Sequence, residues 1–210
     1  MYISAEAIRD IEQRYGTPAE VHLSYEMTGR EFDMVSRSQK HGRAHDVTLF
    51  IFKEDSLVVI KKPMYPPGAY RAPSGGINPG EDFEEGSLRE AYEETGLVVE
   101  LKKYLLRARV KFTHQSRVID WTSHVFTASA VGGSLQPVDV HEIVEARWAS
   151  VDELNGPIKA ALVASGSTGL RYRAELGEIV LGMLIEGGLL PPPAGETPTG
   201  RNEFETFDLK

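Results

Sequence analysis

Residues 75–97 constrain this chain more than any other segment, because a glycine- and proline-rich loop leads there into a cluster of acids around one arginine. If the second half of the segment is helical, Glu90 and Glu94 lie one turn apart and Glu93 lies beside them. Like charges this close repel each other, and Arg89 is the only cation nearby in the sequence. The pattern therefore predicts that a divalent metal ion compensates the charge.

Both ends of the predicted helix are marked in the sequence. Asp82 is placed to cap the first turn, and Gly96 supplies the left-handed residue that ends the helix. Ahead of the helix, Pro73–Gly76 and Pro79-Gly80 favour a tight loop with few side chains, whose backbone can approach a metal or a phosphate closely. An ordinary solvated acidic helix is the alternative, and it leaves the repulsion between the acids uncompensated.

These residues resemble the Nudix box, G-x5-E-x7-R-E-U-x-E-E-x-G-U, in which U is a bulky aliphatic residue. So many specified residue types at fixed offsets rarely coincide by chance. Ala91, a small residue at the first U position, is a departure from the pattern and suggests looser packing of the helix there. The other specified positions that match are Gly75, Glu81, Arg89, Glu90, Glu93, Glu94, Gly96 and Leu97.

The resemblance implies a pyrophosphohydrolase that cleaves the diphosphate of a nucleoside diphosphate linked to another group, with Mg²⁺ or Mn²⁺ as cofactor. The chemistry agrees with it. A diphosphate repels an attacking hydroxide, so an enzyme has to neutralise the phosphoryl oxygens and position a water molecule. A hard cation held by carboxylates does both, and this segment is rich in carboxylates.

The resemblance also implies roles for individual residues. It makes Glu90 and Glu94 the leading metal ligands, Glu93 a further ligand or the base that deprotonates water, and the Gly75 carbonyl a further ligand. Arg89 would orient the acids. Glu81 has two open interpretations, since it either binds a second metal through water or only ends the loop.

Candidates outside the box rest on weaker signals. Glu142 and Glu145 occupy a segment that resembles the place where many members of this family carry a further catalytic or metal-binding glutamate; an ordinary exposed acid is an equally good interpretation. Arg71 and Tyr70 lie just upstream of the box and are candidate contacts to a phosphate or a base. For these two, bracing the proline-rich loop is the favoured alternative.

The order of expected elements is typical of the Nudix α/β/α sandwich with a mixed sheet. Ser4 and Ile3 start a short N-terminal helix that ends at Gly16, and residues 17–45 are otherwise expected to be irregular apart from one strand. The expected strands are Val21–Tyr25, Val47–Phe52, Leu57–Lys61, Val98–Phe112, Trp121–Val131 and Ala146–Ala149. The expected later helices are Val151–Ala164 and Tyr172–Glu186.

This pattern divides the chain into three parts: an N-terminal helix and extension (1–45), a Nudix domain with C-terminal helices (46–186) and a flexible tail (187–210). The chain has no cysteine, which excludes disulfides and thiolate chemistry. Its formal net charge of −8 argues against broad binding to nucleic acid or anionic membranes. We expect a cytoplasmic protein with a small nucleotide substrate, without a membrane segment, and with homodimerisation suggested by the family.

Two alternatives belong to other functional classes. A nucleotide-sensing Nudix domain that binds without turnover is the first, and the intact acids argue against it. An isoprenoid diphosphate isomerase of the same fold is the second. That branch of the family relies on a catalytic cysteine, and this chain has none.

Overall fold

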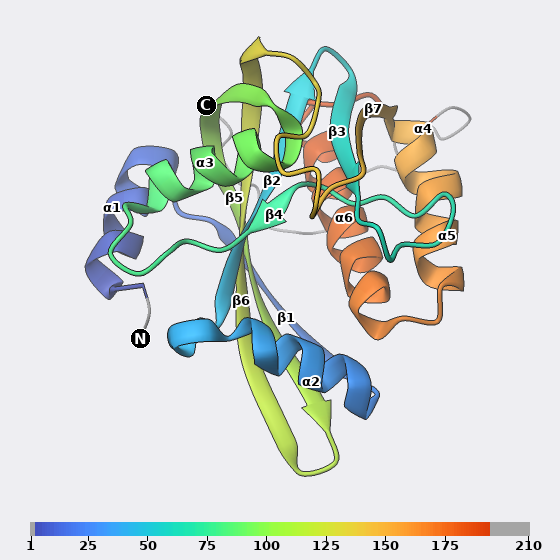
Figure 1. Ribbon diagram of the computed structural model, residues 1–210. Helices are drawn as coiled ribbons and strands as arrows, with labels where there is room; N and C mark the ends of the chain where they lie inside the picture. Colours follow the sequence, from blue (N-terminus) through green and yellow to red (C-terminus); the bar gives the residue numbers. More distant parts are fainter. Residues whose placement is uncertain (1–2, 194–210) are drawn as a thin grey trace.

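The structure is a computed structural model that describes residues 3–193. Its centre is a mixed seven-stranded sheet in the order β1-β5-β6-β2-β3-β7, with β4 paired to β2 outside this path. Helices cover both faces of the sheet, so the prediction of an α/β/α sandwich is confirmed (Figure 1).

The strands run as the apolar segments of the sequence predict. β1 pairs parallel with β5 and β2 pairs parallel with β6, while the remaining neighbours are antiparallel. β2 and β3, which follow each other in the chain, form an antiparallel hairpin. The strands are β1 (Ala19–Glu26), β2 (His45–Lys53), β3 (Ser56–Lys61), β4 (Ser74–Gly75), β5 (Leu97–His114), β6 (Arg117–Gly133) and β7 (Glu145–Ser150).

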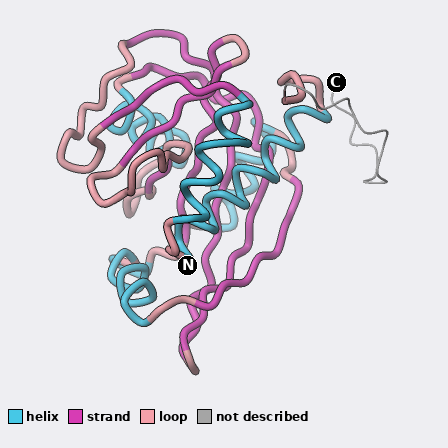
Figure 2. The backbone as a smooth tube through the Cα atoms, turned by 90° about the vertical axis from the view of Figure 1, so that its right-hand side faces the viewer, coloured by secondary structure: helices cyan, strands magenta, loops and turns pink. Residues whose placement is uncertain are grey.

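The β5–β6 hairpin forms the spine of the sheet. Its two strands are the longest in the molecule, and their lower ends extend beyond the helical layers (Figures 1 and 2). Apolar residues alternate with exposed ones along much of β5, as expected for a strand with two different faces. β5 begins directly after Gly96, so the position of this hairpin sets where the acidic helix ends.

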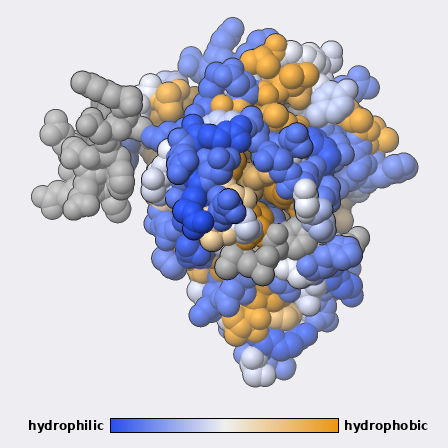
Figure 3. Space-filling model, turned by 90° about the vertical axis from the view of Figure 1, so that its left-hand side faces the viewer, coloured by the Kyte–Doolittle hydropathy of each residue, from blue (hydrophilic) through white to orange (hydrophobic). Residues whose placement is uncertain are grey.

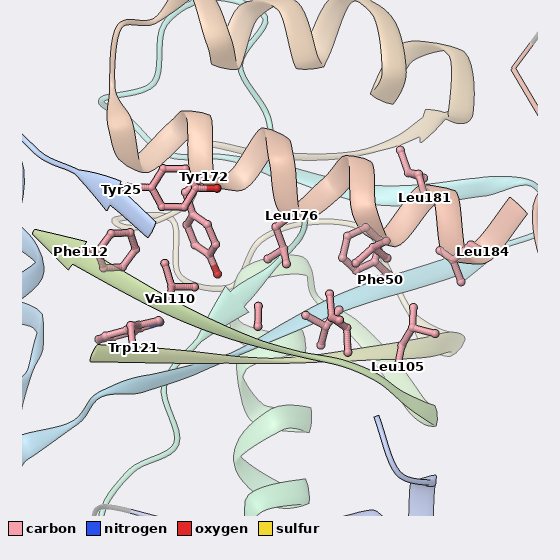
Figure 4. Packing of buried hydrophobic residues seen from close by; sticks show 14 of the residues in the cluster. Tyr25, Phe50, Leu105, Val110, Phe112, Trp121, Tyr172, Leu176, Leu181 and Leu184 are labelled. Atoms are coloured by element: carbon pink, nitrogen blue, oxygen red, sulfur yellow. The ribbon is translucent and has the colours of Figure 1, made fainter. Parts of the chain in front are cut away.

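Three hydrophobic clusters pack the described residues together, and two of them show how the main helices meet the sheet. One lies between the sheet and α6 (Thr168–Glu186), where Tyr172 and Leu176 meet Phe50 and Phe112 (Figure 4). The other lies between the sheet and two helices, α1 (Ala5–Tyr15) and α3 (Phe83–Thr95). The side of the molecule on which α1 lies is mostly hydrophilic (Figure 3), and Glu85 and Tyr92 of α3 are exposed. The acidic helix is therefore packed on one side and faces water on the other.

The expectation that residues 17–45 are irregular apart from one strand is wrong, because α2 (Gly29–Ser38) lies between β1 and β2. Its start is a capping box in which Thr28 accepts from the Glu31 backbone and Glu31 accepts from the Thr28 backbone. Phe32 is the buried residue of this helix, so its apolar stripe is too short to stand out in the sequence. A short 3₁₀ turn, η1 (Lys40–Gly42), follows.

The predicted helix over Val151–Ala164 is also wrong in part. The segment is divided into α4 (Val151–Glu153), a π-helical turn η2 (Leu154–Ile158) and α5 (Lys159–Ala164). Pro157 lies inside η2, where a proline lacks the N–H that a regular helix needs. The predicted helix over Tyr172–Glu186 is confirmed as part of α6, which begins earlier, at Thr168.

Two structural observations bear on the predicted division of the chain into three parts. β1, from the N-terminal part, joins the main sheet through β5, and Leu190, past the predicted end of the domain, is buried against the core next to α6. Packing therefore extends beyond residue 186. The rest of the predicted tail, 194–210, lies outside the described residues. Within residues 3–193, we find no helix with the length and apolar character needed to cross a membrane.

Candidate functional site

Helix α3 begins and ends as its sequence predicts. The Asp82 carboxylate accepts hydrogen bonds from the backbone N–H groups of Glu84, at 2.9 Å, and Glu85, at 3.1 Å. Gly96 has φ 73° and closes the helix in the left-handed conformation. Ala91 is 0% exposed, so this small residue lies on the buried face of the helix. The helix is thus fixed at both ends and along its buried face.

Arg89 connects three acids and the preceding loop. Its Nε and Nη2 donate to the two carboxylate oxygens of Glu81 at 2.7 and 2.9 Å, and its Nη1 donates to Glu90 at 2.9 Å and to Glu93 at 2.8 Å. Nη2 also donates to the Gly76 carbonyl at 3.0 Å. The hydrogen bonds from Arg89 hold the pKa of Glu81 below its usual value. Arg89 therefore orients the acids.

Glu90 lies in a cradle formed by two glycines. The Gly76 N–H donates to its carboxylate at 3.2 Å, and a Cβ atom on Gly75 would lie only 1.8 Å from Oε2 of Glu90. Burial raises the pKa of Glu90, although Arg89 opposes the shift. Glycine at position 75 is thus required by the close approach of the carboxylate to the loop.

Glu94 lies deeper, at 3% exposure. Its carboxylate accepts from the Ser74 N–H at 2.6 Å and lies 3.3 Å from Nη2 of Arg71. Burial raises the pKa of Glu94 to about 7, and the charge of Arg71 opposes the shift. Arg71 is itself buried and donates to the Tyr65 hydroxyl and to the Ala72 carbonyl. Arg71 thus braces the loop behind Glu94.

Tyr70 and Glu145 are close to each other in the structure. The Tyr70 hydroxyl donates to Glu145 at 2.8 Å, and the guanidinium of Arg147 lies 4.6 Å from the centre of the Tyr70 ring. An arginine in this position already occupies a face of the ring. Tyr70 is therefore engaged by its own neighbours at the β3–β7 edge.

The loop between β6 and β7 carries Glu142, whose charge acts on Glu90, one of the three acids of helix α3 (the α3 acids: Glu90, Glu93 and Glu94). The Glu142 carboxylate forms an ion pair with Nζ of Lys62, which directly follows β3. After burial and the effects of Arg89 and Glu93, the charge of Glu142 contributes to raising the pKa of Glu90. Lys62 in turn counters the effect of burial on Glu94. The sequence analysis missed Lys62, whose only signal was a charged residue directly after a buried strand.

The donor set suits a hard divalent cation. Glu90 and Glu94 are carboxylates that burial has partly removed from water. Gly75 has no side chain, so the Glu90 carboxylate can approach the backbone of the loop, whose carbonyls are further oxygen ligands. Within residues 3–193, no three histidine, cysteine, aspartate or glutamate side chains converge as a preassembled metal site. Arg89 and Arg71 pair with the acids instead, so a cation has to compete with these ion pairs.

A comparison with protein families decides the relationship. The model of the NUDIX domain family matches residues 42–167, more than half of the chain. The chain belongs to the NUDIX family. The residues of the predicted box, which Arg89, Arg71 and the glycine loop bring together, lie within the matched region.

Individual NUDIX relatives match only parts of the chain. The NAD-capped RNA hydrolase NudC of Chromobacterium violaceum is 33% identical over 100 residues, which cover 48% of this chain and 35% of that protein. Nudix hydrolase 25 of Arabidopsis thaliana is 39% identical over 57 residues, covering 27% of this chain and 33% of the relative. A crystal structure of a UDP-X diphosphatase aligns with a TM-score of 0.45 at 20% identity, over 75% of this chain and 72% of that one.

Proposed function

We propose that this NUDIX protein is a metal-dependent hydrolase that cleaves the diphosphate linkage of a nucleoside diphosphate joined to another moiety. The observation that carries the proposal is the meeting of the α3 acids with Glu142 and two cations, Arg89 and Lys62. This combination supplies ligands for a cation, a proton acceptor and positive charge for phosphate oxygens at one place.

Glu90 and Glu94 would hold a Mg²⁺ or Mn²⁺ ion, with Glu93 and the Gly75 carbonyl as further ligands. Glu81 is a candidate for a second ion through water, although its bidentate contact with Arg89 favours a role in holding the loop. When bound, the metal would neutralise phosphoryl oxygens and lower the pKa of a coordinated water.

Glu142 is our candidate for the proton acceptor. Its side chain is half exposed, pairs with Lys62 and acts by its charge on Glu90, whereas Glu93 pairs with Arg89 within α3. Water attacks one phosphorus as its proton passes to the Glu142 carboxylate. The bond from that phosphorus to the bridging oxygen then breaks, and two monophosphates leave. Lys62 binds a phosphate oxygen during this step, while Arg89 keeps the acids in place.

The names of the relatives suggest a class of substrate. The NudC relatives are named for hydrolysis of NAD-capped RNA, so a dinucleotide diphosphate, free or at an RNA end, is our first choice. We retain the expectation of a cytoplasmic protein with a small nucleotide substrate. The expectation that no nucleic acid binds is tested directly by a capped RNA. Homodimerisation stays a proposal as well.

Release of monophosphates from NADH, ADP-ribose, nucleotide sugars, diadenosine polyphosphates and NAD-capped RNA, with Mg²⁺ or Mn²⁺, tests the proposal. Glu94→Gln should abolish hydrolysis while keeping the fold, and Glu54→Gln, in the exposed β2–β3 turn, serves as the matched control. Hydrolysis that persists undiminished in Glu94→Gln would contradict the assignment. Metal-supported binding of a nucleotide without any hydrolysis would instead establish a sensor.

A further inference from the structure

The loop between β6 and β7 caps the C-terminal end of α3. The backbone N–H groups of Val138 and Asp139 both donate to the Glu93 carbonyl, at 3.0 and 2.9 Å, and the Gln136 N–H donates to the Thr95 carbonyl at 2.9 Å. Carbonyls in the last turn of a helix have no partner within the helix. The loop therefore takes its position from the same helical turn that carries the catalytic acids.

Asp139 makes a second set of contacts, with the backbone around Glu142. Its Oδ1 accepts from the N–H groups of His141, at 3.0 Å, and Glu142, at 3.1 Å, which closes an Asx turn. Its backbone carbonyl accepts from the N–H groups of Glu142, at 3.2 Å, and Ile143, at 2.9 Å. One residue thus binds α3 through its own N–H and fixes the Glu142 backbone through its carboxylate and its carbonyl.

The other side of Glu142 is fixed as well. Ile143 is 1% exposed, and the Val144 N–H donates to the Lys61 carbonyl at 2.9 Å where the chain enters β7. Between these two anchors, Glu142 extends its side chain to Lys62. Its distance from the α3 acids is therefore set by the turn on one side and by β7 on the other.

We propose that Asp139 is a positioning residue that sets where Glu142 lies relative to the α3 acids. The inference rests on the proposed function, because it assigns a purpose to the placement of Glu142. A merely structural role is the alternative, in which Asp139 supports the loop and the end of α3 without a specific effect on Glu142. The two interpretations predict different activities for a variant that carries substitutions at both Asp139 and Glu142.

Steady-state kinetics of Asp139→Ala and Asp139→Asn test the inference. The alanine variant should lower kcat about 10- to 100-fold with little change in KM, because a displaced proton acceptor affects the chemical step. Asparagine keeps the Oδ1 acceptor, so Asp139→Asn should restore most of the rate. Asp55→Ala, in the exposed β2–β3 turn, is the matched control and should match the wild type.

A double-mutant cycle separates positioning from general support. In a Glu142→Gln background, Asp139→Ala should cost little further activity, because both changes act on the same group. A full additional loss in that background would overturn the inference. So would a loss of the same size in Asp139→Asn and Asp139→Ala.

Hydrogen exchange gives a measurement that does not depend on turnover. The amides of His141, Glu142 and Ile143 should exchange faster in Asp139→Ala than in the wild type or in Asp139→Asn. Unchanged exchange in the alanine variant would overturn the inference whatever the activity. A wild type that hydrolyses no substrate contradicts the proposed function alone, and the exchange rates then decide whether Asp139 holds Glu142.

Discussion

The guanidinium of Arg71 lies 3.3 Å from the carboxylate of Glu94, and both side chains are buried. The two residues come from different elements, since Arg71 belongs to the loop before β4 and Glu94 to the last turn of α3. The pair therefore connects the loop before β4 to α3 on the buried side of the helix. It places the Glu94 carboxyl group inside the protein, where burial raises its pKa to about 7 and the charge of Arg71 opposes the shift.

Arg71→Met should lower the free energy of unfolding by about 3 kcal/mol, because removing one partner leaves Glu94 buried without compensation. Urea denaturation measures this change. The double variant Arg71→Met/Glu94→Gln should regain part of the loss, since the buried charge is gone. Arg30→Met, at an exposed position of α2, is the control. Equal stability of the Arg71 and Arg30 variants would show that the buried pair contributes nothing.

Gly75→Ala should abolish most activity without unfolding the protein. The new Cβ would meet Glu90 Oε2 at 1.8 Å, so the carboxylate has to move, and a displacement of this kind costs roughly 100-fold in rate. Gly182→Ala, in α6, is the matched control because nothing lies within 4 Å of its Cβ position. Thermal unfolding and initial rates of both variants provide the test. Full activity of Gly75→Ala would contradict the cradle around Glu90.

Lys62→Met should raise KM by about 10-fold with a smaller effect on kcat, because a charge-assisted contact to phosphate is lost. The comparison is with Lys53→Met, an exposed lysine at the end of β2. Initial rates over a range of substrate concentrations separate the two constants. If KM stays at the wild-type value, Lys62 serves only to pair with Glu142.

Stability should fall in acid because two buried histidines resist protonation. Burial lowers the pKa of His124 to about 3 and that of His45 to about 4. An unfolded histidine titrates near pH 6.5, so below this pH the unfolded chain binds more protons than the folded one. The free energy of unfolding should therefore decrease as pH falls from about 6.5 toward about 3 to 4, by up to about 1.4 kcal/mol per pH unit for each histidine.

His124→Asn checks the assignment, because asparagine does not titrate and can still meet the Tyr104 hydroxyl that contacts His124. Denaturant unfolding between pH 4 and 7 should show a shallower pH dependence in this variant. His22→Asn, at an exposed position, should leave the slope unchanged. A wild-type slope in His124→Asn would assign the acid sensitivity to other groups.

Glu31→Ala should cost about 2 kcal/mol of stability, because this carboxylate serves the starts of two helices. One oxygen accepts from Thr28 in the capping box of α2, and the other accepts from the Ser167 hydroxyl and from the Thr168 N–H, at 2.8 and 2.7 Å, where α6 begins. Burial opposes ionisation of Glu31, but these hydrogen bonds lower its pKa. Thermal unfolding tests the loss, and Glu31→Gln should fall between alanine and the wild type.

Short-range patterns predicted much of the fold. The β2–β3 hairpin and the long strands follow from runs of apolar residues, and the ends of α3 follow from Asp82 and Gly96. α2 was missed because a short helix with one buried residue gives a weak periodic signal. The break at Pro157 was missed because an apolar pattern on both sides of it continues.

The sequence alone determined that acids cluster on α3, since helical spacing places Glu90, Glu93 and Glu94 together whatever surrounds them. Only the tertiary structure decided that Arg71 lies behind Glu94, that Lys62 meets Glu142 and that Asp139 ties the Glu142 turn to α3. The reason is physical. Backbone geometry fixes distances between residues a few positions apart, whereas contacts between distant segments depend on strand register and on how helices and loops pack against the sheet.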